Sequence, residues 1–92
     1  MSYKIIISKN FEKRFNKLSD YLKERVKKIL IDLENNLLGS SLKGDLSGFY
    51  SIHFERNKYR IIYFLNDVHI EIVAVHVGKR TDSFYTELKK KI

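Results

Sequence analysis

Lys79 and Arg80 follow Gly78 at the end of an apolar segment, and Tyr85 comes five residues later. Lysine and arginine resist burial, so packing is a poor explanation for such a basic pair. Glycine lets the backbone turn sharply or lie close to another group. Arg60 opens a second segment rich in β-forming residues. Arginine and lysine bind phosphate and tyrosine stacks on bases, so these residues predict contact with a nucleic acid.

The composition of the chain restricts the chemistry that these residues can perform. The chain has 92 residues, which predicts a single domain over residues 1–92. It has no cysteine and only three separated histidines, which argues against disulfides, a thiolate nucleophile and the usual zinc sites. We therefore expect neither a metal nor another cofactor. The formal net charge of +7 favours a polyanionic partner.

The hydropathy of the sequence gives no indication of a membrane. No apolar run is long enough to span a bilayer, and no basic leader precedes an apolar stretch. No expected helix combines a broad basic face with a bulky apolar one, so we expect no membrane binding. The expected location is the cytoplasm.

Two helices are predicted in the first third of the chain, after a short strand at residues 3–8. Ser8 is a helix cap, and apolar residues follow at helical spacing: Phe11, Phe15 and Leu18. Ser19 and Asp20 provide a second cap for a helix that should end at residues 35–36. The short connection predicts an antiparallel helical hairpin.

The rest of the chain predicts a sheet and a terminal helix. Residues 39–48 hold three of the four glycines and predict a loop. Alternation over residues 50–55 predicts a half-exposed strand, whereas residues 59–65 and 68–77 are apolar on both faces and predict covered strands. A helix capped by Thr81 or Asp82 would carry Phe84, Leu88 and Ile92. The fold class is α+β: a strand, an antiparallel helical hairpin, a three-strand antiparallel meander and a short C-terminal helix, with the helices on one face of the sheet.

This order of elements resembles the RelE/ParE superfamily of bacterial and archaeal toxins, and in particular its RelE branch. The resemblance covers nearly the whole chain, and its motifs are Leu42-Lys43-Gly44, Gly48-Phe49-Tyr50, residues 58–63, residues 77–80 and Tyr85. It implies a RelE-like fold and a metal-independent endoribonuclease that cuts messenger RNA in the ribosomal A site and so inhibits translation. It also implies a type II toxin–antitoxin system, in which a cognate RelB-type antitoxin silences the toxin.

The resemblance assigns catalytic positions to Arg60, Arg80 and Tyr85. Two further positions, usually lysines on the first meander strand, correspond here to Ser51 and His53. Lost lysines weaken phosphate binding, whereas a histidine adds a group that titrates near neutrality. The departure indicates either histidine-based acid–base chemistry or a weakened enzyme.

Cleavage of RNA without a metal or a protein nucleophile uses the ribose 2′-hydroxyl as the attacking group. It needs a base, positive charge near the phosphorane, and an acid for the leaving 5′ oxygen. In this interpretation His53 is the base, Arg60 and Arg80 hold the scissile phosphate, and Tyr85 stacks on a base or joins the proton transfer. The expected RNA-binding set is Lys79, Lys43, Lys58, Ser51 and the lysines at 89–91, while His69 and His76 are interpreted as structural.

The sequence leaves three functions open. The leading one is the ribosome-dependent endoribonuclease, whose partners are the ribosome, messenger RNA and the antitoxin, with no DNA contact by the toxin alone. The second is a ParE-like inhibitor of DNA gyrase, which shares the fold and needs no catalytic set. The third is a basic RNA-binding module without chemistry. In both toxin interpretations, we expect the antitoxin to cover the remaining apolar strand surface with an amphipathic helix or an added strand.

Overall fold

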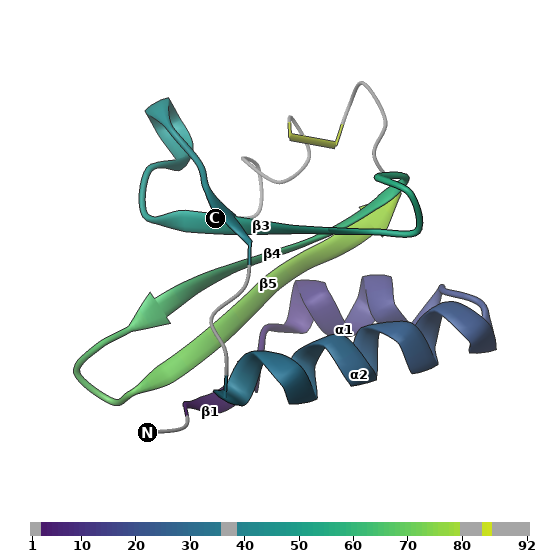
Figure 1. Cartoon of the computed structure of the whole chain (residues 1–92), viewed down its shortest axis with the longest axis horizontal. Coiled ribbons are helices and arrows are strands. Elements are labelled where there is room, and N and C mark those ends of the chain that lie inside the picture. The colour runs from purple at the N-terminus through teal and green to yellow at the C-terminus, as the bar shows by residue number, and fades with distance from the viewer. Residues whose placement is uncertain (1–2, 36–38, 80–83, 86–92) are drawn as a thin grey trace.

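Two helices pack on one face of a five-stranded sheet in the computed structural model of the chain, which describes residues 3–35, 39–79 and 84–85 (Figure 1). The elements are β1 (Lys4–Ile7), α1 (Lys9–Asn16), α2 (Asp20–Asn35), β2 (Ser40–Ser41), the 3₁₀ turn η1 (Gly44–Leu46), β3 (Phe49–Phe54), β4 (Tyr59–Asn66) and β5 (Glu71–Lys79). The strand order is β1-β5-β4-β3-β2, and only the β1–β5 pair is parallel among these strands. The α+β class and the antiparallel meander expected from the sequence are confirmed.

Both helices begin at the caps that the sequence indicates. Ser8 Oγ accepts a hydrogen bond from the Phe11 N–H at 3.1 Å, and Ser19 Oγ accepts one from the Leu22 N–H at 3.3 Å. Each bond satisfies a backbone donor that the first helical turn leaves without a partner. Of the expected C-terminal helix, only Phe84 and Tyr85 are described, and both are helical. No helix in the described ranges combines the length and the apolar character needed to cross a bilayer.

The sheet carries a hydrophobic cluster on each face. The helical face packs against α1 and α2, and its buried residues include Phe11, Val26, Leu33, Ile52, Phe54, Ile61, Tyr63, Ile72, Ala74 and Val77. The opposite face, which we call the distal face, has a smaller cluster of Leu46, Ile62, Val75 and Phe84. The sequence predicted that an antitoxin would cover apolar strand surface that the helices leave open. The chain itself already buries Ile62 and Val75, so this part of the strand surface needs no partner.

The structure corrects two boundaries. The loop expected over residues 39–48 contains β2 and η1. The residue before β2 has to be glycine, because φ at Gly39 is +103° and a Cβ there would lie 2.6 Å from the Ser51 carbonyl oxygen. The strand expected from residue 68 begins only at Glu71, because residues 67–70 form a turn in which Val68 is 85% exposed. A two-residue strand is too short for a periodic signal, and Val68 has a strand-forming side chain in a turn.

Side chains of α1 complete the edge of the sheet where β1 stops. β1 ends opposite Ala74, while β5 continues to Lys79. Beyond Ala74, the Val75 carbonyl accepts hydrogen bonds from Ser8 Oγ at 3.3 Å and Asn10 Nδ2 at 2.8 Å, and the Val77 carbonyl accepts one from Arg14 Nε at 2.6 Å. These bonds replace the strand partner that β1 no longer supplies. We call this stretch of β5, residues 75–77, the α1-capped edge.

His76 is fully buried beside this edge and is held as a neutral imidazole. Its Nδ1 lies 2.9 Å from Asn10 Nδ2, and since an amide nitrogen is a donor, Nδ1 accepts and the ring proton is assigned to Nε2. On the other side its ring packs edge-on against Phe84, with the centroids 4.8 Å apart. Burial, and to a smaller extent the charge of Arg14, lower the pKa of His76 from 6.5 to about 4.

We expect the protein to lose stability in mild acid because of His76. Its pKa is lower in the folded chain than in the unfolded chain, so the unfolded chain binds more protons between about pH 4 and pH 6.5. The free energy of unfolding therefore falls as the pH falls through this window, by at most about 3 kcal/mol for this group. Urea denaturation at several pH values across the window measures the slope.

The variant His76→Gln should flatten that slope, whatever its stability at neutral pH. His69→Gln is the matched control, because His69 is exposed in the turn after β4. If His76→Gln keeps the parental slope, another group causes the acid sensitivity.

Candidate active site

Arg60 lies at the centre of the candidate site, near the start of β4. Its register partners are His53 on β3 and Gly78 on β5. Directly paired residues of antiparallel strands carry their side chains on the same face, with Cβ atoms about 4.5–5.5 Å apart. Arg60 alternates with the helical-face residues Tyr59 and Ile61, so its side chain leaves from the distal face. It is only 9% exposed.

Tyr85 covers Arg60 from the C-terminal segment. Arg60 Nη1 donates a hydrogen bond to the Tyr85 hydroxyl, and its Cζ lies 5.6 Å from the centre of the Tyr85 ring. Phe84 fixes this segment, because its fully buried ring packs against both Tyr85 and His76. The structure therefore brings together two residues that are 25 positions apart in the sequence and that the sequence assigned to one site.

The guanidinium of Arg60 is incompletely satisfied within the described part of the chain. Its Nε is buried and has no hydrogen-bond partner there, and no described carboxylate forms an ion pair with it. Ser51 Oγ, on the same face, is also buried without a described partner. A buried cation without a counter-charge is costly, so such a group is retained where an anion binds. The surroundings of Arg60 suit a phosphate.

His53 joins this group from β3. It is exposed on the distal face, directly across from Arg60 in the strand register. Arg60, Tyr85 and His53 together offer a positive charge, a hydroxyl and an imidazole within one small surface. No group of three or more histidine or acidic side chains in the described ranges is placed to hold a metal ion. Arg80, assigned to the same site from the sequence, lies outside the described residues.

Two residues of the expected RNA-binding set, Ser51 and Lys43, offer no accessible contact beside Arg60. Ser51, expected on an exposed face, is only 2% exposed, so it offers no surface contact here. Lys43 is exposed beside Leu42, whose N–H bonds to the Phe49 carbonyl at the far end of β3. That end is about 13 Å along the strand from His53. The lysines at 89–91 lie outside the described residues.

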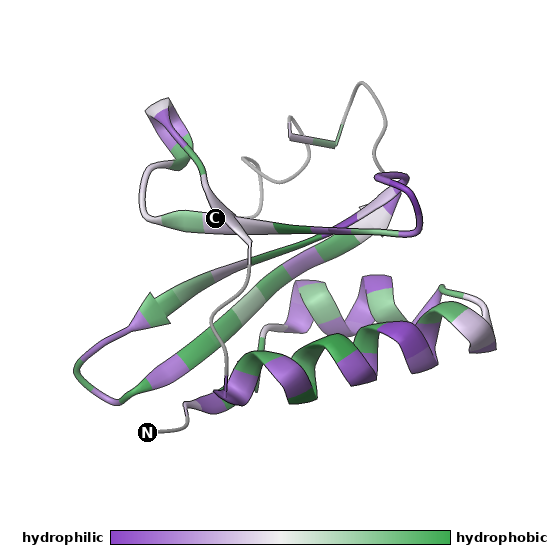
Figure 2. Ribbon diagram, in the orientation of Figure 1, coloured by the Kyte–Doolittle hydropathy of each residue, from purple (hydrophilic) through white to green (hydrophobic). Residues whose placement is uncertain are grey.

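Lys58 and Lys79 line a cavity of about 560 Å³ beside the turn between β3 and β4. Lys79 is paired with Tyr59, a helical-face residue, so its side chain leaves the sheet on the side opposite to Arg60. The full lining is Ser19, Tyr21, Leu22, Glu55, Arg56, Lys58, Tyr59 and Lys79. This part of the chain is the hydrophilic turn seen at one end of the sheet in Figure 2. The structure thus divides the expected RNA contacts between two faces.

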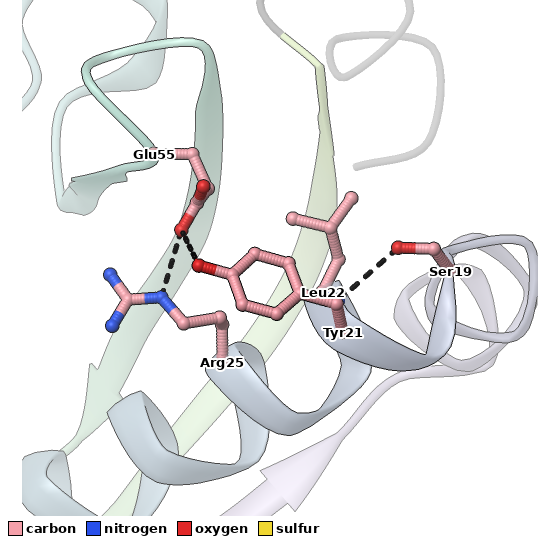
Figure 3. A network of polar contacts seen from close by, with 5 residues as sticks. All are labelled: Ser19, Tyr21, Leu22, Arg25 and Glu55. Atoms are coloured by element: carbon pink, nitrogen blue, oxygen red, sulfur yellow. Dashed lines mark hydrogen bonds and ion pairs between the residues drawn. The ribbon is translucent and has the colours of Figure 1, made fainter.

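A polar network attaches that turn to α2 (Figure 3). Glu55 Oε1 accepts a hydrogen bond from Arg25 Nε at 2.9 Å and one from the Tyr21 hydroxyl at 3.3 Å. The turn needs support because Glu55, Arg56 and Asn57 all have positive φ, from 52° to 72°. An exposed ion pair contributes about 1 kcal/mol or less, so its main effect is to orient the turn between His53 and Arg60.

Gly78 does not form a turn, but it allows the close approach of another group that the sequence also suggested. It lies inside β5, and a Cβ there would overlap Arg14 Nη2 and lie 3.2 Å from Arg14 Cζ and Nε. Glycine is needed because the guanidinium of Arg14 occupies that space. Sequence reasoning missed Arg14, which is one of four basic residues in the first helix region. Gly78 was the only signal that something approached β5 closely.

Comparison with known proteins gives a consistent result. Residues 5–89 match the sequence profile of the family described as ParE-like toxin of type II bacterial toxin-antitoxin system. The toxin RelE of Mycobacterium tuberculosis is 34% identical over 47 residues, 51% of this chain and 46% of that protein, so the chain matches about half the length of this curated relative.

Solved structures share the fold over most of the chain. The toxin–antitoxin complex RelBE2 from Mycobacterium tuberculosis contains a chain with a TM-score of 0.79 and 24% identity, with 87% of this chain and 100% of that one covered. A mutant of E. coli toxin RelE in complex with a RelBc antitoxin peptide has a TM-score of 0.74 and 28% identity, with 100% and 99% covered.

Proposed function

Because the chain belongs to the family of ParE-like toxins of type II bacterial toxin–antitoxin systems, we propose that it is a RelE-type toxin that cleaves messenger RNA on the ribosome. The observation that carries this proposal is the nearly buried guanidinium of Arg60, with an unpartnered Nε in the described structure, between Tyr85 and His53. An inhibitor that acts by protein contact alone has no need of such an arrangement.

The chemistry follows from the positions of these three residues. His53 removes the proton of the ribose 2′-hydroxyl, whose oxygen attacks the adjacent phosphorus. Arg60 stabilises the charge that develops on the phosphorane oxygens. The Tyr85 hydroxyl accepts from Arg60, so its own proton is available to the leaving 5′ oxygen. The bond from phosphorus to the 5′ oxygen breaks, and the products are a 2′,3′-cyclic phosphate and a 5′-hydroxyl end.

We expect the ribosome to be required for rapid cleavage. In this proposal Arg60, His53 and Tyr85 supply charge and proton-transfer groups, and none of the three has the role of holding the ribose. Orientation of the 2′-hydroxyl in line with the leaving oxygen must then come from elsewhere, and correct orientation is worth several orders of magnitude in rate. Naked RNA should be cut poorly by the purified protein.

The deciding experiment maps messenger RNA 5′ ends after brief induction of the protein, with DNA-damage signalling recorded in parallel. New 5′ ends inside translated regions, absent when translation initiation is blocked, support the proposal. Induction of the DNA-damage response without new 5′ ends would contradict it and would favour a ParE-like inhibitor of gyrase. Growth without either signal would contradict both toxin activities.

We expect Lys58 and Lys79 to act in docking rather than in the chemical step, because they lie in the cavity on the helical side. The double variant Lys58→Gln/Lys79→Gln should raise the toxin concentration needed for half-maximal cleavage on programmed ribosomes. The cleavage rate at saturating toxin should remain unchanged. The effect should shrink at high salt, because contacts to RNA phosphates are screened.

Lys23→Gln/Lys27→Gln is the matched control, since it removes the same charge from α2 outside the cavity lining. A fall in the saturated rate of the cavity variant, with no change in half-maximal concentration, would assign these lysines to the reaction itself.

A RelB-type antitoxin is the proposed protein partner. The net charge of +7 favours an acidic partner, and Ile31 on α2 and Ile7 on β1 are 62% and 46% exposed. The structurally similar RelBE complexes support this proposal. Co-expression with the product of the adjacent gene should yield a stable complex, and a toxin that stays alone would contradict it.

A further inference from the structure

Arg14 brings a second guanidinium to the β5 side of the candidate site. It projects from α1, its Nε donates to the Val77 carbonyl at 2.6 Å, and its guanidinium takes the space where a side chain at 78 would stand. Gly78 is the register partner of Arg60, so that space is on the distal face, next to Arg60. Arg14 is half-buried, which leaves part of its side chain open to solvent.

The distance between the two arginines is set by the sheet. Arg14 Cζ is 3.2 Å from the Cβ position at 78, and paired Cβ positions in a sheet are about 5 Å apart. Arg14 Cζ therefore lies within about 9 Å of Arg60 Cβ. An arginine side chain spans most of that separation, so both guanidiniums can contact one phosphate placed over Gly78.

Electrostatics favour an anion at this position. Arg60 and Arg14 are like charges on the same face, and His76, two residues before Gly78, is kept neutral beside them. A phosphate placed over Gly78 would be attracted by both guanidiniums. Hydrogen bonds from two arginines to one phosphate are also the strong, charge-assisted kind.

We propose that Arg14 binds the scissile phosphate of the RNA together with Arg60, from the opposite side of Gly78. Arg14 is then a substrate-binding residue supplied by α1 rather than by the sheet, and Gly78 is the residue that gives it access. This inference rests on the proposed RNA cleavage.

The test is single-turnover cleavage on programmed ribosomes by the variant Arg14→Gln. The saturated rate should fall by about 10²-fold, as for removal of one group that stabilises charge in the transition state. The concentration for half-maximal cleavage should change little, because ribosome docking does not involve the phosphate site. Arg14→Lys should recover part of the rate, since it keeps the charge but loses the planar fork.

Lys13→Gln is the matched control: it removes the same charge from the neighbouring, exposed position of α1, outside the pocket that Arg14 lines, and should cleave at the parental rate. Thermal unfolding of every variant separates binding from folding, since Arg14 also bonds to the α1-capped edge. The inference fails if Arg14→Gln cleaves at the parental rate. It also fails if Arg14→Lys is as slow as Arg14→Gln and the loss of rate in both variants follows their loss of thermal stability.

The outcomes distinguish the two proposals. If the parental chain cleaves and Arg60→Gln does not, while Arg14→Gln does, only the role of Arg14 is wrong. If the parental chain does not cleave on programmed ribosomes, the proposed function fails and the role of Arg14 with it.

Discussion

Replacing His53 with alanine is expected to slow cleavage on programmed ribosomes by about 10²–10⁴-fold, the usual contribution of a general base. His53 is exposed on the distal face directly across from Arg60, so its loss removes the base without removing buried packing. Ribosome binding and thermal stability should be nearly unchanged. Single-turnover rates, measured with toxin in excess over ribosomes, isolate this step.

His69→Ala is the control, because His69 is also exposed but lies in the turn before β5. It should cleave at the parental rate. If His53→Ala also cleaves at the parental rate, His53 is not the base. Its presence where the family usually has a lysine then does not indicate histidine-based acid–base chemistry.

The second large effect is expected for Arg60. Arg60→Gln should lower the saturated cleavage rate by about 10²–10³-fold, because it removes the charge that stabilises the phosphorane. Toxicity on induction should disappear. Arg60 is only 9% exposed and bonds to Tyr85, so the variant must be shown to fold by its thermal transition before its rate is interpreted.

Tyr85→Phe separates the two functions of this contact. It keeps the ring over Arg60 but removes the hydroxyl, so the fold should persist while protonation of the leaving oxygen is lost. Arg60→Lys should be intermediate between Arg60→Gln and the parental chain. A variant Arg60→Gln that folds and remains fully toxic would contradict the phosphate site.

The helices could be predicted because their signals are local. Ser8 and Ser19 are caps whose bonds reach only three residues along the chain, and both are present in the structure. The family could be predicted because five short motifs occur in order, and the profile match over residues 5–89 confirms it. The turn before β5 extends to residue 70, further than expected, because Val68 within it has a strand-forming side chain.

The site was only partly predictable because it depends on contacts between distant segments. That Arg60 and Tyr85 meet could be expected from the resemblance alone, not from their spacing. Alternation along the strand places Lys79 on the helical face and Gly78 beside Arg60, but this needs the register of β4 and β5. Ser51 lies on the expected face of its strand, yet it is only 2% exposed, and alternation along one strand does not show whether other segments cover that face. Arg14 is one basic side chain among many until its position over Gly78 is known.

The α1-capped edge has a consequence for the behaviour of the chain in concentrated solution. β5 is the longest strand in the described part of the chain and is rich in valine and isoleucine, a composition that recruits other strands when backbone groups are left open. Ser8, Asn10 and Arg14 occupy the carbonyls of Val75 and Val77, so edge-to-edge aggregation cannot begin there. Within the described residues, the two outermost strands are β1 and β2, which have four and two residues, and short edge strands are poor templates for a fibre. The N-terminal end of α1 and its cap, which complete this edge of the sheet, thus also oppose polymerisation through β5.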